Sequence, residues 1–258
     1  MEPKRWASLA LSLLLAAVFT GCGFLPSEDF DDYDVSSYIQ ALLDSSYHNT
    51  HESFMSVAHA TQETAQSNNT TTVENAAVNF CNAYSLSPTD QQLAGFQDVM
   101  SKALLSARYT VQDEQKVDTG YTIQVDVSSI SSLCGLQEEF AKLRTQAQEE
   151  AAAANSTPEP AEDGDEDEDE DGWDEDAYGE EEPTPIPAPT PAPTPAVDAY
   201  QLYIDKVLEY CRAKVSQVDY EPQAVSIVMD IRLTDQGELQ LDLNQLDAID
   251  QAVLLFSK

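Results

Sequence analysis

Four side chains that could bind a metal lie close together near residue 48. Asp44 and His48 are four residues apart, so on a helix they would share one face, and zinc accepts carboxylate and imidazole ligands. His51 and Glu52 follow, but the order His-x-x-His-Glu differs from the His-Glu-x-x-His motif of zinc metalloproteases. The segment is also typical of a junction between two helices, where polar residues are common. We therefore expect no metal and no cofactor here.

The N-terminal residues predict a cleaved signal followed by a lipid attachment site. A basic pair precedes an apolar run over residues 7–18, which as a helix reaches about 18 Å, short of a hydrocarbon core of ~30 Å. The run ends in Phe-Thr-Gly-Cys, which resembles the lipobox of bacterial lipoproteins, in which the cysteine receives a diacylglyceryl group. The resemblance implies that residues 1–21 are removed and that Cys22 carries the lipid. Residues 22–33 would then form a short acidic tether.

Part of a calcium-binding pattern lies in the acidic stretch of the chain. The first half of an EF-hand loop is matched by Asp167, Asp169, Asp171 and Gly172. The twelfth position should provide a bidentate glutamate, but it is Tyr178, and no helical pattern flanks the loop. We expect only weak attraction of divalent cations to a solvated acidic segment.

The three other cysteines and the missing motifs argue against an enzyme. Cys81, Cys134 and Cys211 form no Cys-x-x-Cys pair, and their odd number leaves at least one thiol free. Cys81 and Cys211 coincide with apolar stripes, which predicts small buried side chains, and one disulfide between an undetermined pair stays open. The chain has no Gly-x-Ser-x-Gly turn, Ser-x-x-Lys motif or glycine-rich phosphate loop. We favour a non-enzymatic role, although two carboxylates would suffice for a glycosidase.

The charge balance excludes one class of partner. The 258 residues include 47 Asp and Glu against 12 Lys and Arg, which gives a net charge of −35. Binding to nucleic acid requires Lys and Arg clustered against the phosphates, so we expect no nucleic-acid partner. Hydrophobic residues make up 42% of the chain, which is enough for a core.

Composition also predicts a long linker within the chain. Between residues 159 and 182, sixteen of twenty-four residues are acidic, and proline then occupies every second position from 183 to 195. The first part repels itself and the second has too few backbone donors, so neither can pack. We expect residues 156–196 to form a disordered acidic and proline-rich insertion.

Apolar residues recur at helical spacing on both sides of this linker. Upstream, four helices are predicted from stripes that begin at Val35, Phe54, Val73 and Leu93. The third helix should open with a capping box of Thr71 and Glu74, and the fourth with Ser87 as a cap before Pro88. Three further helices are predicted over residues 136–154, about 197–215 and 246–256.

Strict alternation predicts two hairpins, each with one apolar face. The turns fall at residues 118–120 and 235–237. The apolar face, which helices should cover, carries Tyr121, Ile123, Val125, Ile227, Met229, Ile231, Leu239 and Leu241. The opposite face should be open to water or a partner, with only Val228 interrupting a set that includes Thr122, Gln124, Asp126, Ser128, Ser226, Asp230, Arg232, Glu238, Gln240 and Asp242.

These elements indicate an α+β fold. A lone two-stranded hairpin is marginal in water, whereas four strands with one face covered by helices can close a core. We therefore predict helices packed on one face of a four-stranded antiparallel sheet, formed in a single domain by residues 34–155 and 197–258. Two separate domains are the alternative.

The pattern of helices and hairpins resembles uncharacterised lipoproteins of Firmicutes. The likeness rests on residues 107–111, 120–127 and 224–233, each flanked by helices. Some of those proteins are assigned a cone-shaped α+β fold similar to nuclear transport factor 2, so the resemblance implies a cone-like domain. Enzymes of that fold use pocket acids and tyrosines that match no position here, and no catalytic residue is carried over.

Together these features predict a bacterial lipoprotein anchored through Cys22 to the outer face of the cytoplasmic membrane. The leading hypothesis is a non-catalytic binding or scaffold module for a protein or envelope partner. Alternatives are a small-ligand binder or enzyme with a pocket between helices and sheet, and a structural envelope spacer. A concave pocket with converging polar groups would favour the small-ligand alternative.

Overall fold

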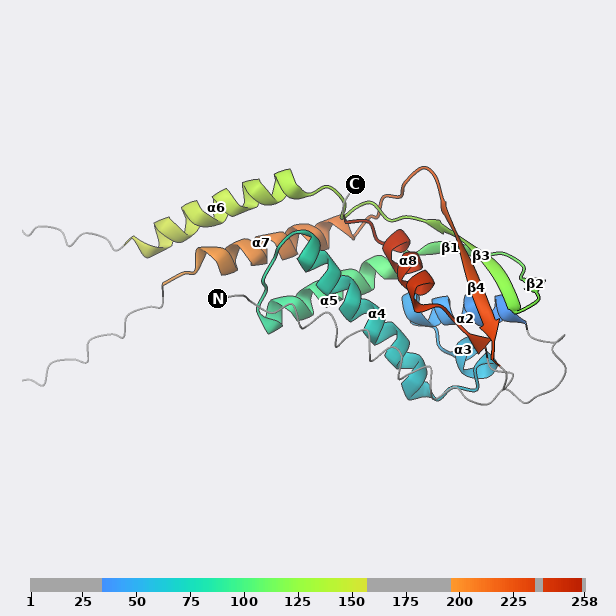
Figure 1. Cartoon of the computed structure of the whole chain (residues 1–258). Helices are drawn as coiled ribbons and strands as arrows, with labels where there is room; N and C mark the ends of the chain where they lie inside the picture. The colour runs from blue at the N-terminus through green and yellow to red at the C-terminus, as the bar shows by residue number, and fades with distance from the viewer. Residues whose placement is uncertain (1–33, 157–195, 235–238, 257–258) are drawn as a thin grey trace, which may run out of the picture.

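The structure is a computed structural model that describes residues 34–156, 196–234 and 239–256. Helices and one antiparallel sheet build the described part, which confirms the predicted α+β class (Figure 1). The predicted signal, tether and lipid site, residues 157–195 of the predicted linker and the EF-hand-like residues lie outside the described residues. None of the described helices is both long enough and apolar enough to span a membrane.

The sheet has five strands rather than the four expected. They are β1 (Arg108–Val111), β2 (Gln115–Val117), β3 (Gly120–Ser128), β4 (Val225–Leu233) and β5 (Leu239–Gln240). Their order is β1-β3-β4-β5, and β2 pairs with β3 on the same edge as β1. The extra strand arises because the chain leaves the ladder between β1 and β2 and then returns to it.

The two predicted hairpins meet along their long strands. β3 and β4 pair antiparallel, with Tyr121 opposite Ile231 and Ile123 opposite Met229. Since β3 precedes the linker and β4 follows it, the chain on both sides of the linker contributes to one sheet. Gly120 is required at the start of β3, where φ is 147° and an added Cβ would collide with the backbone oxygen of Ile231.

The sheet is one-sided, as the alternation predicts. Along β3 the side chains of Ile123 and Val125 are buried while Gln124 between them is exposed. In β4 the exposed set includes Asp230, Arg232 and Val228, and Val228 is 56% exposed on the otherwise polar face. Three residues expected in the core are only half-buried: Ile227, Leu239 and Leu241.

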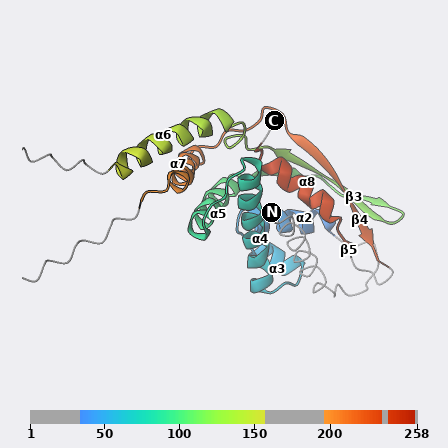
Figure 2. The same ribbon diagram turned by 60° about the vertical axis from the view of Figure 1, so that its left-hand side comes forward.

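Seven helices are described, and most of them lie on or beyond the apolar face of the sheet. They are α2 (Val35–Tyr47), α3 (Glu52–Val57), α4 (Gln62–Ala83), α5 (Asp90–Leu104), α6 (Gln137–Asn155), α7 (Ala199–Lys214) and α8 (Leu243–Val253). Figure 2 shows α8 against β3 and β4, and α8 contacts both strands. Helices α6 and α7 lie side by side and project away from the sheet (Figures 1 and 2).

Two predicted helix starts are wrong. Thr71 and Glu74 lie inside α4, which begins after Thr61, and the Thr61 side chain accepts a hydrogen bond from the Thr64 backbone. The second predicted stripe is accordingly divided between α3 and the start of α4. The run of Asn and Thr in the middle of α4 has the composition of a boundary, but the core contacts of the helix continue through it.

The other corrected start is that of α5. Its cap is Thr89 rather than Ser87, and Thr89 forms a capping box with Gln92. The Ser87 backbone N–H instead donates to the Tyr200 hydroxyl at 2.8 Å. Helix α5 then packs closely on α7, because Gly95 has no Cβ and one placed there would lie 2.5 Å from a methyl carbon of Leu208.

Candidate functional site

The predicted pair Asp44 and His48 does come together, at the end of α2. Asp44 Oδ1 accepts hydrogen bonds from the Tyr109 hydroxyl at 2.5 Å and from Gln40 Nε2 at 3.0 Å. His48 Nδ1 lies 3.4 Å from the same oxygen, and His48 Nε2 lies 3.0 Å from the backbone oxygen of Ala107. Burial, then the hydrogen bond to Asp44, raises the pKa of Tyr109, so the phenol stays a donor. The pair connects α2 to β1.

The other residues of the predicted cluster point elsewhere. His51 Nδ1 lies 3.0 Å from the buried Ser45 hydroxyl, which also donates to the backbone oxygen of Ala65. Glu52 is exposed at the start of α3, and His59 is exposed between α3 and α4. Within the described ranges, no group of three His, Cys, Asp or Glu side chains is placed to hold a metal ion.

The cysteines behave as hydrophobic residues. Cys81 is 5% exposed and Cys211 is fully buried, as their stripes predict, while Cys134 is half-buried. None of the three forms a disulfide within the described residues. Burial raises the pKa of Cys81 to about 11 and also raises the pKa of Cys211, so neither forms a reactive thiolate near neutral pH.

A candidate binding site lies instead beside α4, along an edge of polar side chains. Asn68, Thr72, Asn75 and Asn79 follow one another at spacings of four, three and four residues, so they form one line along the helix. The neighbouring stripe of α4 is buried in the core and consists of Ala65, Val73, Ala77, Phe80 and Cys81. Packing of this apolar stripe therefore fixes the direction in which the polar edge faces.

The facing wall is formed by α8 and the extended segment that follows it. Ile130 holds this segment by two backbone hydrogen bonds, from its N–H to the Val253 oxygen at 2.9 Å and from Leu255 N–H to its own oxygen at 3.1 Å. The Tyr84 hydroxyl donates to the Phe256 backbone oxygen at 2.7 Å. These bonds fix the backbone of residues 254–256, so the wall is built from rigid elements.

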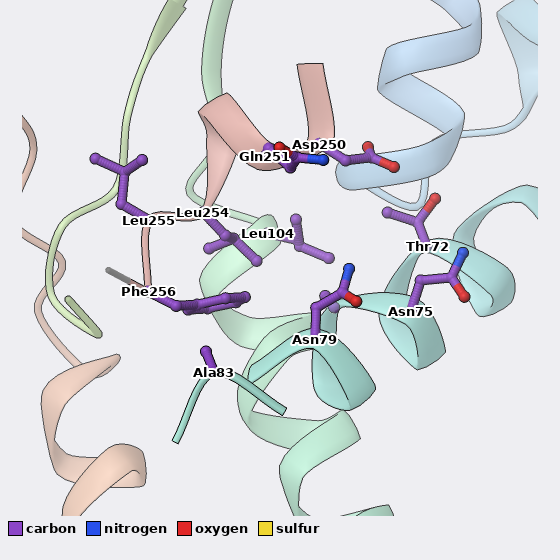
Figure 3. Close-up of a pocket in the computed structure, with 11 residues that line it drawn as sticks. Thr72, Asn75, Asn79, Ala83, Leu104, Asp250, Gln251, Leu254, Leu255 and Phe256 are labelled. Carbon is purple, nitrogen blue, oxygen red and sulfur yellow. The ribbon is translucent and has the colours of Figure 1, made fainter. Parts of the chain in front are cut away.

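A cavity of about 420 Å³ lies between the two walls, and we call it the α4–α8 groove. Figure 3 shows its two ends. The apolar end contains Ala83, Leu104, Leu254 and Phe256; the polar end contains Thr72, Asn75 and Asp250. A smaller cavity of about 50 Å³ shares Thr72 and Asp250 with it and extends to Tyr47. The volume of the groove falls in the range typical of small-molecule sites.

Asp250 is the charged group of the groove. Its Oδ1 accepts a hydrogen bond of 2.5 Å from the hydroxyl of Tyr47, which is 2% exposed at the end of α2. Burial raises the pKa of Asp250 to about 6, the charge of Asp247 adds to the rise, and the Tyr47 hydrogen bond opposes it. Burial, followed by the charge of Asp250, also raises the pKa of Tyr47. Near neutral pH, Tyr47 is therefore a neutral donor and Asp250 is mostly a carboxylate.

Two side-chain atoms of the polar edge are left without a hydrogen-bond partner. Asn75 Oδ1 and Asn68 Nδ2 are both inaccessible to solvent and unsatisfied. A buried polar atom without a partner costs about 1–3 kcal/mol, so such atoms are rare in folded proteins and call for an explanation. Asn75 lines the larger cavity and Asn68 the smaller one, so uncompensated polar atoms lie beside both cavities.

Sequence reasoning did not identify this site. One signal for the site is Asp250, which follows the buried Ile249 in α8. A carboxylate that faces inward at such a position is unexpected. The Asn- and Thr-rich middle of α4 is the second signal, but its composition predicts the start of a helix at Thr71. The cavity also lies between two helices, not between helices and the sheet.

Comparisons with known proteins give one structural match. No protein-family model matches the chain, and no curated protein matches it. The crystal structure described as "a putative lipoprotein (ycdA)" from Bacillus subtilis superposes with a TM-score of 0.53 at 11% sequence identity. The match covers 86% of this chain and 56% of that one, so this chain spans little more than half of its neighbour's length. The likeness shows that the two proteins share a fold.

Proposed function

We propose that this protein is an extracytoplasmic lipoprotein that binds a small ligand in the α4–α8 groove. The observation that carries the proposal is the combination, in one cavity of about 420 Å³, of an apolar wall and the Asp250 carboxylate, which has no ion pair among the described residues. A charged group next to an apolar wall of rigid backbone is typical of ligand sites.

Binding is favoured over catalysis by the chemistry of the walls. Among the described residues that line the two cavities, Asp250 is the only carboxylate, and none is a histidine, cysteine, lysine or arginine. Asp250 is the only one of these lining groups that titrates near neutral pH, because burial raises the pKa of its partner Tyr47. The leading hypothesis from the sequence is a scaffold role, and a concave pocket with converging polar groups is the feature that favours a small-ligand binder instead. The groove is such a pocket, so it supports binding of a small ligand.

The anchor and the location are part of the same proposal. The lipobox-like residues before Cys22 and the lipoprotein description of the Bacillus neighbour both support a lipid anchor outside the cytoplasmic membrane. The finer resemblance to nuclear transport factor 2 stays a prediction. With a charge of −35, the protein would be held at the membrane by its lipid and not by attraction to anionic headgroups.

The test is a ligand screen against a groove-blocked variant. Asn79 is exposed at the groove, so Asn79→Trp should fill the cavity without disturbing the core. Gln66→Trp is a matched control on an exposed part of α4 that lines neither cavity. In a thermal-shift screen of small metabolites, ligands should raise the Tm of the wild type and of Gln66→Trp but not of Asn79→Trp, since binding stabilises only the folded state. Equal shifts in all three proteins would contradict a site in the groove.

A further inference from the structure

The α4–α8 groove has a strong imbalance of charge and hydrogen-bonding groups. Asp250 contributes the formal charge, and no basic side chain is among the described residues that line the groove. In the part of the chain that the structure describes, Asp250 makes no ion pair, and its hydrogen bond from Tyr47 is to Oδ1 alone. The described residues therefore provide no counter-charge for this carboxylate.

The groups around Asp250 do not supply that counter-charge. Tyr47 is neutral at physiological pH, and the Asn75 oxygen is a second acceptor without a donor. Figure 3 places Asp250, Thr72 and Asn75 at the same end of the cavity. A ligand that complements this end carries positive charge and a donor, because the Asp250 carboxylate has acceptor capacity that Tyr47 does not use.

The other end of the groove defines the rest of the ligand. Leu254 is 5% exposed and Phe256 packs edge-to-face on Phe80, with ring centroids 5.4 Å apart, so this wall is apolar and held in place. A bare divalent cation would gain nothing from that wall and would find too few oxygen ligands at Asp250 and Asn75, since calcium takes six to eight. A small cation with an apolar body satisfies both ends.

We propose that the groove binds an organic ammonium ion with an apolar body. The ammonium group pairs with Asp250, while the body lies along Leu254 and Phe256. The charge of −35 on the whole chain raises the local concentration of such cations and repels anionic competitors. This inference rests on the proposed function, because it names the class of ligand for the same groove.

The experiment compares three probes that share one apolar body. Phenylbutylamine, phenylbutanol and phenylbutanoate are titrated into the purified full chain by calorimetry at neutral pH. The amine should bind about tenfold more tightly than the alcohol, which reports the charge pair, and the acid should bind most weakly of the three. Comparable affinity for all three would overturn the ammonium assignment and leave the groove as a binding site.

Two variants locate the effect. Asp250→Asn should lower the affinity for the amine about tenfold and leave the affinity for the alcohol nearly unchanged. Asp247→Asn is the matched control, because Asp247 is an exposed carboxylate on the same helix that lines neither cavity. Loss of amine binding in both variants alike would assign the effect to the general negative field and overturn the pairing with Asp250.

A third variant tests the same site without changing Asp250, in case Asp250→Asn does not fold. Asn79→Trp should abolish binding of the amine and of the alcohol together, because it fills the cavity and leaves the carboxylate in place. If the amine binds equally well to Asn79→Trp, its site lies elsewhere and the assignment is wrong. If none of the three probes binds the wild type and the metabolite screen is also negative, the proposed function fails together with the ligand class.

Discussion

Replacing Asp250 by asparagine removes the carboxyl group from the groove but keeps its shape and an oxygen that can accept from Tyr47. Burial raises the pKa of the wild-type carboxyl in the folded state to about 6, against an ordinary value of 3.8. A difference of about two pKa units corresponds to ~3 kcal/mol at 1.36 kcal/mol per unit. Because the side chain keeps some contact with solvent, we expect ionisation of Asp250 to lower the free energy of unfolding by about 1–3 kcal/mol.

The sign follows from which state holds the proton more tightly. Since the folded-state pKa is the higher one, folded protein keeps a proton that unfolded chains release between about pH 4 and pH 6. Stability of the wild type should therefore fall as the pH rises through this window. The loss of stability caused by ionising Asp250 is absent below pH 3.8 and complete above about pH 6. The free energy of unfolding of Asp250→Asn minus that of the wild type should therefore be larger above pH 6 than at pH 4, by about 1–3 kcal/mol.

Urea unfolding followed by circular dichroism at about pH 4 and about pH 7 measures this change. All other carboxyl groups, including Asp247, are present in both proteins, so their contributions largely cancel in the difference between variant and wild type. Any constant effect of the substitution cancels as well. A stability difference that is the same at both pH values, or that moves in the opposite direction, would refute the claim that the half-buried Asp250 has no counter-charge among the described residues.

Four further substitutions test the sheet and the anchor. Ile123→Ala should cost about 2–5 kcal/mol because Ile123 is buried, whereas Gln124→Ala on the exposed face should cost well under ~1 kcal/mol; equal losses in urea melts would contradict the one-sided sheet. Gly120→Ala should cost more than about 2 kcal/mol, because its new Cβ meets the Ile231 backbone oxygen, and an unchanged Tm would show that β3 and β4 do not approach so closely. Cys22→Ser should release the protein from the membrane fraction or leave it unprocessed, and normal retention and processing would rule out lipid attachment at this residue.

The sequence predicted the elements whose apolar pattern is uninterrupted. The stripe from Val35 to Tyr47 became α2, and the alternation around Ile123 became β3, because burial of one face sets the period of each pattern. It failed at the start of α4, where Thr71 has the local chemistry of a cap but lies in a helix that core contacts extend in both directions. At this position tertiary packing therefore determines where the helix begins, and the local capping residues do not.

The groove could not be predicted from the sequence because it depends on contacts between distant segments. Tyr47 and Asp250 are 203 positions apart, and nothing in either local sequence indicates the other. By contrast, Asp44 and His48 are one helical turn apart, and their proximity was predicted correctly. The structure gives the Asp44 carboxylate partners in Tyr109 and Gln40, whereas the carboxylate of Asp250 retains unused acceptor capacity.

The most direct test of the central claim, that the α4–α8 groove is the ligand site, is a map of where a ligand binds. Amide chemical shifts of the isotope-labelled full chain are followed by NMR during a titration with phenylbutylamine. We predict that the largest shifts occur in α4 between Asn68 and Asn79 and in the segment from Asp250 to Phe256, and that Asn79→Trp removes them. Saturable shifts confined to other surfaces, with these two segments unchanged, would contradict the account.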